Sequence, residues 1–121
     1  MKLREHKAIL EDKKFEEKHS FSALVIRYAR EIPPGFVTTY GALARAAGGG
    51  GMAARSITGI LGKAWNNGVH DIPFHRIVYS GGKIWTDAQH DAERLRLYKK
   101  EKIEIIDGKI KDFEEKEYRF R

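Results

Sequence analysis

The sequence predicts a single, mainly helical α/β domain of the winged helix-turn-helix type, with short β-hairpins. Three observations support this prediction. The chain has 121 residues, of which 41% are apolar, and this suits one small domain with one hydrophobic core. Apolar residues recur at helical spacing in the first half of the chain. In the second half, glycine-containing turns separate short runs rich in β-branched residues.

The first expected helix covers residues 21–32. Four large apolar residues follow the i, i+3, i+4, i+7 spacing of one helical face: Phe21, Leu24, Val25 and Tyr28. The segment Pro33-Pro34-Gly35 ends this helix, because proline lacks the backbone N–H that a continuing helix needs.

A helix-turn-helix is expected next. Thr38 or Thr39 caps a short, alanine-rich helix that ends at Ala47. The glycines 48–51 break this helix, and a second helix of small residues covers about 53–63. The segment Asn66-Asn67-Gly68 then turns the chain. A short helix, a glycine turn and a second helix are the outline of a helix-turn-helix.

Two hairpins and a helix are expected in the second half. Residues 77–79 and 84–85 form the first hairpin around a glycine turn. Thr86 or Asp87 caps a helix that runs to about Glu101, with apolar contacts supplied by Leu95 and Leu97. Residues 103–106 and 109–110 form the second hairpin around the strong turn signal Asp107-Gly108.

The formal net charge of +6 lies in the middle of the chain. Residues 21–100 carry eleven Lys and Arg against five Asp and Glu, whereas residues 1–20 carry six against five and residues 101–121 six against seven. This distribution suggests a surface for a polyanion, although an ordinary soluble basic protein would have the same charge. We divide the chain into a charged N-terminal extension (1–20), a folded domain (21–106) and a charged C-terminal tail (107–121).

Several classes of function are disfavoured by what the chain lacks. It contains no cysteine, which excludes disulfides, thiolate metal sites and thiol catalysis. The histidines at 70, 75 and 90 lack a helical ligand spacing with a third partner, so no metal is expected, and no cofactor either. The sequence has no long apolar run and no signal peptide, so we expect no membrane partner and a location in the cytoplasm, at the nucleoid or in the nucleus. We also expect a monomer.

Ordered motifs between Phe21 and Ile106 carry a family resemblance. They are the segments Ile32–Gly41, Ala53–Gly59, Asn66, Pro73–Arg76 and Leu97–Glu101. Together they resemble the DNA-binding and active-site domain of the O6-alkylguanine-DNA alkyltransferases. They are more similar still to the alkyltransferase-like proteins, which lack the nucleophilic cysteine. Phe74 stands in the place of that cysteine, and a benzyl side chain can neither attack an alkyl carbon nor carry one away.

The resemblance implies a DNA-binding surface on the helix-turn-helix. Tyr40 matches a tyrosine that crowds a phosphate and promotes rotation of a nucleotide out of the helix, and Arg55 matches an arginine that fills the vacated space. Small neighbours would let the second helix approach the minor groove: Ala53, Ala54, Ser56 and Gly59. From the residues alone, Tyr40 could also be a core aromatic, Arg55 a solvated charge, and the small residues a helix-packing face.

The resemblance also implies a lesion pocket around Phe74. His75, Glu101 and Asn66 match the groups that activate and order the cysteine of the enzymes, and here we expect them to be structural hydrogen-bonding groups. Phe74 either stacks on a flipped base or fills the pocket and closes it. Asp87 stands where related proteins have a base-contacting arginine, so it could merely cap the last helix. In that case other residues would line the pocket: Lys83, Trp85 or Arg94.

The function that the resemblance implies is recognition without repair. The protein would bind double-stranded DNA, hold a flipped O6-alkylguanine and mark it for nucleotide-excision repair proteins. One alternative is a DNA-binding module, perhaps with a regulatory role, whose pocket is closed and which has no lesion specificity. Another is an enzyme of a different kind that uses His75 and Glu101.

Overall fold

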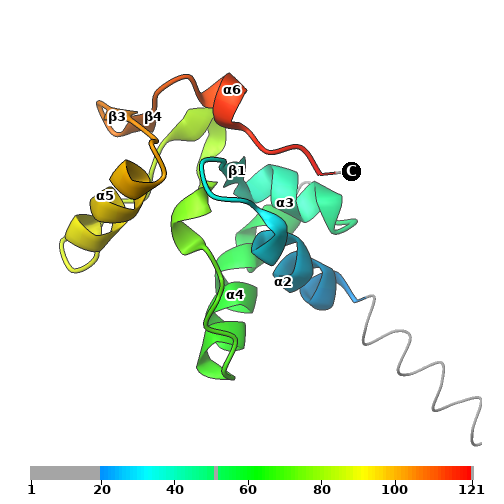
Figure 1. Cartoon of the computed structure of the whole chain (residues 1–121). Coiled ribbons are helices and arrows are strands. Elements are labelled where there is room, and N and C mark those ends of the chain that lie inside the picture. Colours follow the sequence, from blue (N-terminus) through cyan, green and yellow to red (C-terminus); the bar gives the residue numbers. More distant parts are fainter. Residues whose placement is uncertain (1–19, 51, 121) are drawn as a thin grey trace, which may run out of the picture.

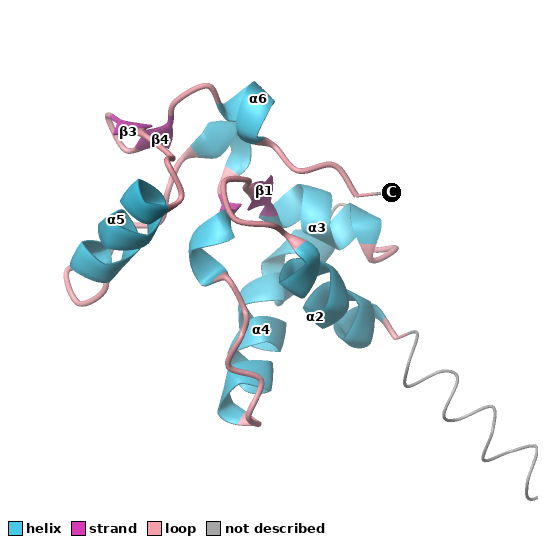
Figure 2. Ribbon diagram, viewed as in Figure 1, coloured by secondary structure: helices cyan, strands magenta, loops and turns pink. Residues whose placement is uncertain are grey.

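The computed structural model describes residues 20–50 and 52–120, so almost all of the proposed N-terminal extension lies outside the described residues. The helices are α2 (Phe21–Glu31), α3 (Tyr40–Ala46), α4 (Ile57–Asn66), α5 (Asp91–Lys100) and α6 (Phe113–Lys116). The strands are β1 (Thr38–Thr39), β2 (Ile77–Val78), β3 (Ile105–Ile106) and β4 (Lys109–Ile110). This mainly helical arrangement with two small sheets confirms the predicted fold class (Figure 2). None of the described helices is long and apolar enough to cross a membrane.

Helices α2, α3 and α4 pack around the main hydrophobic core (Figure 1). The expected helix 21–32 is confirmed, with its buried face on Val25 and Ala29, and it stops before the two prolines. Of the two candidate caps for α3, Thr39 is the one used, because its hydroxyl accepts a hydrogen bond from the Ala42 N–H at 3.0 Å. The first half of the chain therefore folds as its local pattern predicts.

The turn of the helix-turn-helix depends on Gly49. A Cβ at this position would lie 2.6 Å from the Cβ of Ala53 and 2.7 Å from a ring carbon of Phe21, so only glycine fits. The second helix, expected over 53–63, begins instead as a 3-10 turn, η1 (Ala53–Ser56), and continues as α4 to Asn66. Arg55 consequently lies on the turn in front of α4 and not in the α-helix.

The first predicted hairpin is wrong. β2 pairs in parallel with β1, so that Thr38 lies opposite Ile77 and Thr39 opposite Val78. The chain still turns back, because the Tyr79 N–H donates to the Lys83 carbonyl at 2.8 Å, but Lys83 then bridges to Lys109. Ile77 and Val78 are both buried, as is typical of strands in parallel sheets. A parallel partner needs a long crossover connection, so it lies far away in the sequence.

The helix expected from residue 86 or 87 begins later, at Asp91. The Asp87 carboxylate accepts hydrogen bonds from the Gln89 N–H at 2.8 Å and from His90 Nδ1 at 2.7 Å. These bonds stabilise a turn in front of the helix instead of a first helical turn. The predicted apolar contacts are also partly wrong, since Leu95 is exposed and Tyr98 is the large residue that α5 buries.

The second hairpin is confirmed as β3 and β4, which pair antiparallel around Asp107 and Gly108, both with positive φ. This hairpin lies across the boundary at 106 that we drew between the domain and the tail. The rest of the described C-terminal segment also packs on the domain. The Val37 N–H donates to the Lys116 carbonyl at 2.9 Å, and the Tyr118 N–H donates to the Val37 carbonyl at 2.7 Å. Phe120 packs against Tyr28, with ring centroids 5.5 Å apart.

One carboxylate joins three segments that are distant in the sequence. Glu101, at the end of α5, accepts hydrogen bonds from the Gly35 N–H at 3.0 Å, from Nε and Nη2 of Arg76 at 3.0 Å each, and from His75 Nε2 at 2.5 Å. Arg76 also donates to the Ile32 carbonyl at 2.9 Å. The Glu101 side chain is only 7% exposed. This cluster fixes the Pro33-Pro34-Gly35 turn and the 3-10 turn Phe74–Arg76 (η2) against α5.

The hydrogen bonds also determine the charge of Glu101. Its burial alone would raise the pKa of the carboxyl group. The hydrogen bonds from Arg76, the Gly35 N–H and His75 outweigh this effect and lower the pKa to about 2. Glu101 is therefore ionised in the folded protein throughout the physiological pH range.

We expect Glu101→Gln to lower the free energy of unfolding by about 3 kcal/mol at pH 7, because Arg76 loses its buried partner. Since the pKa of Glu101 in the fold lies below its ordinary value, its contribution is present above about pH 5 and is lost as the pH falls toward 2. The difference between wild type and variant should shrink over that range. Urea titrations at several pH values measure it.

Glu104→Gln is the matched control, since Glu104 forms an ion pair with Lys111 while 70% of its side chain is exposed. This substitution should change stability by less than about 0.5 kcal/mol. Equal losses for the two variants would contradict a special role of Glu101.

Candidate functional site

An open pocket of about 800 Å³ lies between α4 and the segment 70–76 on one side and α5 with Trp85 on the other. Four of the residues predicted for a lesion pocket line it: Asn66, Phe74, His75 and Trp85. Glu101 does not line it but bonds His75 from behind. Asp87 is also absent from its lining. The volume is within the range of ordinary small-molecule sites.

Phe74 lies at one wall of this pocket and does not plug it. Phe74 is 42% exposed, and its ring packs edge-on against the Trp65 ring at a centroid distance of 5.6 Å. The Trp65 ring in turn packs against the His70 ring, with centroids 4.7 Å apart. Neither Trp65 nor His70 was predicted to line the pocket. The available signal was a tryptophan directly before Asn66, a residue that was predicted to line it.

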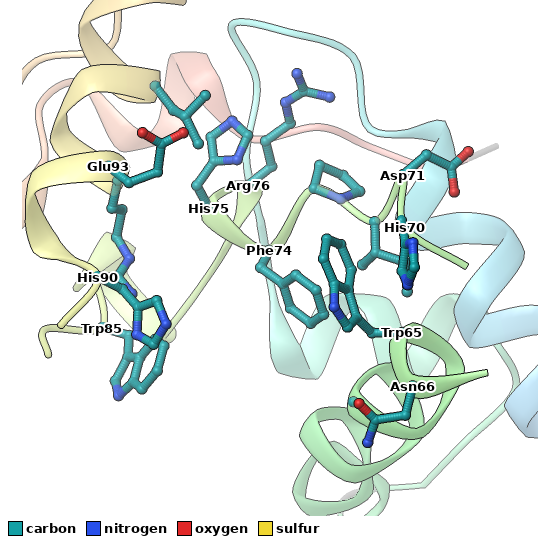
Figure 3. A pocket seen from close by; sticks show the side chains of 15 residues that line it. Trp65, Asn66, His70, Asp71, Phe74, His75, Arg76, Trp85, His90 and Glu93 are labelled. Atoms are coloured by element: carbon teal, nitrogen blue, oxygen red, sulfur yellow. The ribbon is translucent and has the colours of Figure 1, made fainter. Parts of the chain in front are cut away.

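The opposite wall consists of Trp85, His90 and Arg94. The Trp85 and His90 rings are stacked with centroids 6.2 Å apart, and the Arg94 guanidinium lies 4.7 Å from the centre of the Trp85 ring. Figure 3 shows Phe74 with Trp65 on one side of the pocket and Trp85 with His90 on the other. Among the three substitutes considered for an arginine at position 87, Trp85 and Arg94 line the pocket and Lys83 does not.

His75 and Glu101 form a closed pair behind Phe74. Their side chains are 10% and 7% exposed, and His75 Nε2 lies 2.5 Å from Glu101 Oε2. Burial lowers the pKa of His75, against the opposing effect of Glu101. The Tyr98 hydroxyl donates to the His75 backbone carbonyl at 2.6 Å. The pair thus has well-defined structural partners, but the chain offers no thiol for it to deprotonate.

Tyr40 and Arg55 lie on the helix-turn-helix. Tyr40 is the first residue of α3, is half-buried, and its ring lies 5.5 Å from that of Tyr79, an exposed residue that the sequence analysis missed. Burial, with a further contribution from Tyr79, raises the pKa of Tyr40, so its hydroxyl is a neutral donor at pH 7. Arg55 is exposed, and its guanidinium forms no hydrogen bond or ion pair within the described residues.

The small residues around Arg55 divide into two groups. Ala53 and Ala54 are half-buried and pack against the main core, as a helix-packing face does. Ser56 and Gly59 are exposed, and a Cβ at Gly59 would meet no atom within 4 Å. Of the four small residues, Ser56 and Gly59 are therefore the two that could meet DNA directly.

Known proteins resemble this chain in sequence. Residues 20–103 match the family model described as the DNA-binding domain of 6-O-methylguanine DNA methyltransferase. The chain is 37% identical over 90 residues to a bifunctional methyltransferase/endonuclease of Picrophilus torridus, but the match covers 74% of this chain and only 28% of that protein. It is 36% identical over 74 residues to a DNA base-flipping protein of Escherichia coli K12, covering 61% of this chain and 55% of that protein.

Solved structures are similar over more of the chain. The fold matches S. pombe Atl1 in complex with damaged DNA containing O6-carboxymethylguanine, with a TM-score of 0.64 and 28% identity over 83% of this chain and 95% of that one. A second complex of the S. pombe protein with DNA matches with a TM-score of 0.63. The family match covers well over half of the chain, and the chain belongs to the family of the 6-O-methylguanine DNA methyltransferase DNA-binding domain.

Proposed function

We propose that this protein binds duplex DNA, takes an O6-alkylated guanine out of the helix into the pocket beside Phe74, and holds it there without transferring the alkyl group. The observation that carries the proposal is the open pocket with an exposed Phe74 at the place of the family's nucleophile. A lesion on a guanine edge is hidden inside the base stack, so a pocket can read it only after extrusion.

The pocket has the chemistry of a binding site and not of a transfer site. The phenyl ring of Phe74 offers a flat apolar face for stacking but no lone pair for attack on an alkyl carbon. His75 is bonded to Glu101 and can orient the η2 turn, and the chain has no thiol from which it could take a proton. Because the pocket is open, the proposal that it binds a base is favoured over the alternative that Phe74 closes it.

The helix-turn-helix supplies the proposed duplex contacts. Arg55 is exposed and has no bonded partner among residues 20–50 and 52–120, so its guanidinium can enter the stack when a nucleotide leaves. The Tyr40 hydroxyl lies at the start of α3, where it can donate to a phosphate. Extrusion costs a few kcal/mol, and this cost is lowest for a base pair that a lesion has already weakened.

A complex that does not repair its lesion has a use only if another protein acts on it. We therefore include in the proposal that the bound protein marks the lesion for nucleotide-excision repair proteins. The support for this step is the chemical inertness of Phe74, which leaves the lesion in place.

A duplex with one O6-methylguanine should bind at least about tenfold tighter than the same duplex with guanine, because the damaged pair opens more easily. Fluorescence anisotropy at several salt concentrations measures both affinities. The two salt slopes should be similar, since they count phosphate contacts. The mass of the protein should stay unchanged after incubation.

Equal affinities for the two duplexes would leave only a DNA-binding module without lesion specificity. A protein heavier by one alkyl group would refute the non-catalytic part of the proposal.

Arg55→Ala should weaken binding to the lesion duplex by about tenfold or more, and binding to the guanine duplex by much less, because insertion accompanies extrusion. Lys63→Ala is the matched control, since it removes one exposed positive charge from α4 without removing an inserting group. It should weaken binding to both duplexes by the same small factor. If Arg55→Ala behaved like Lys63→Ala, Arg55 would be only a phosphate contact.

A further inference from the structure

Two arginines line the pocket, and they differ in how many of their donors are already used. Arg76 spends Nε and Nη2 on Glu101 and Nη1 on the Ile32 carbonyl. Arg94, although only 8% exposed, has a single hydrogen bond within the described residues, from Nη1 to Asp91 Oδ1 at 2.8 Å. A guanidinium has five N–H donors. Arg94 is therefore the arginine of the pocket with donors to spare.

The position of the Arg94 guanidinium is restricted on two sides. It lies over the Trp85 ring at 4.7 Å, and Asp91 holds it through an ion pair one helical turn away. A planar cation stacked on an aromatic ring keeps its donors in one plane, and this suits bidentate recognition. The charge of Arg94 also reaches the pocket interior, since it adds to the lowering of the His75 pKa that burial mainly causes.

Neighbouring polar groups do not compete for the same role. The Asp87 carboxylate accepts hydrogen bonds from His90 and the Gln89 N–H. The ion pair of Arg94 is formed with Asp91 instead. His90 spends Nδ1 on Asp87. A cation that is nearly buried and has unused donors next to an open pocket is stabilised by a ligand that brings acceptor atoms.

We propose that Arg94, held against Trp85, is the residue that reads the extruded base, by donating to the edge that carries N7 and O6. This inference rests on the proposed function, since it requires a guanine in the pocket. Arginine pairs with that edge of guanine in the usual bidentate contact, and N7 remains an acceptor when O6 is alkylated. The base would then lie between the wall of Phe74 with Trp65 and the wall of Trp85 with His90 (Figure 3).

The test compares duplexes that contain guanine, O6-methylguanine or O6-methyl-7-deazaguanine, the last of which lacks the N7 acceptor. Wild type should bind the deaza lesion about tenfold more weakly than O6-methylguanine. Arg94→Met keeps an unbranched side chain over Trp85 but has no donors. It should lose most of the preference for O6-methylguanine over guanine, and it should bind the two lesions equally.

Arg96→Met is the matched control. Arg96 lies on the same helix and forms an ion pair with Glu93 at the same i, i+3 spacing, but its side chain is 60% exposed. This variant should keep both the lesion preference and the deaza penalty. Thermal unfolding of each variant monitors the fold. If Arg94→Met unfolds too easily, Arg94→Leu replaces it and should also lose the deaza penalty, since its side chain has no donor either.

The outcomes separate this inference from the proposed function. If wild type does not prefer the lesion duplex, the proposed function fails. If wild type prefers it but binds the deaza lesion equally well, Arg94 does not read N7 and only this inference is overturned. The inference is also overturned if the folded Arg94 variant keeps the deaza penalty.

Discussion

The rest of the site depends on the cluster around Glu101. This one carboxylate accepts hydrogen bonds from the turn after α2 and from His75 and Arg76 of η2. It therefore ties the helix-turn-helix half of the domain to α5. The two walls of the pocket belong to these two halves: Phe74 is the first residue of η2, and Arg94 with His90 belongs to α5 and its leading turn. Together with the bond from the Tyr98 hydroxyl to the His75 carbonyl, the cluster holds the two walls at a fixed separation.

The same cluster gives the His75–Glu101 pair a structural role that does not depend on any reaction. In a protein with a nucleophile, a buried His–Glu pair would serve to move a proton. Here the pair is held by structural partners, since Arg76 bonds both carboxylate oxygens and Tyr98 bonds the His75 carbonyl. Removing either residue would leave buried groups unpaired, and this cost is independent of any reaction.

Sequence reasoning succeeded where a local rule decides the structure and failed where distant pairing does. The stop at Pro33, the Thr39 cap and the Asp107-Gly108 turn each follow from a few adjacent residues, and all three are present. The first hairpin failed because β2 pairs with β1, almost forty residues earlier. Local periodicity carries no information about such a partner. The segment Pro73–Arg76 predicted that Phe74 and His75 line the pocket. No motif predicted this for Trp65 or His90, which the fold brings to the pocket.

Asp87 illustrates how the fold resolves a conflict that the sequence leaves open. An acid at position 87 would repel the acceptor edge of a base if it faced the pocket. The structure directs it instead to His90 and the Gln89 N–H, in the turn that leads into α5. That turn delays the start of the helix to Asp91, and Asp91 then pairs with Arg94 beside Trp85. The acid at position 87 thus helps to determine which cation reaches the pocket.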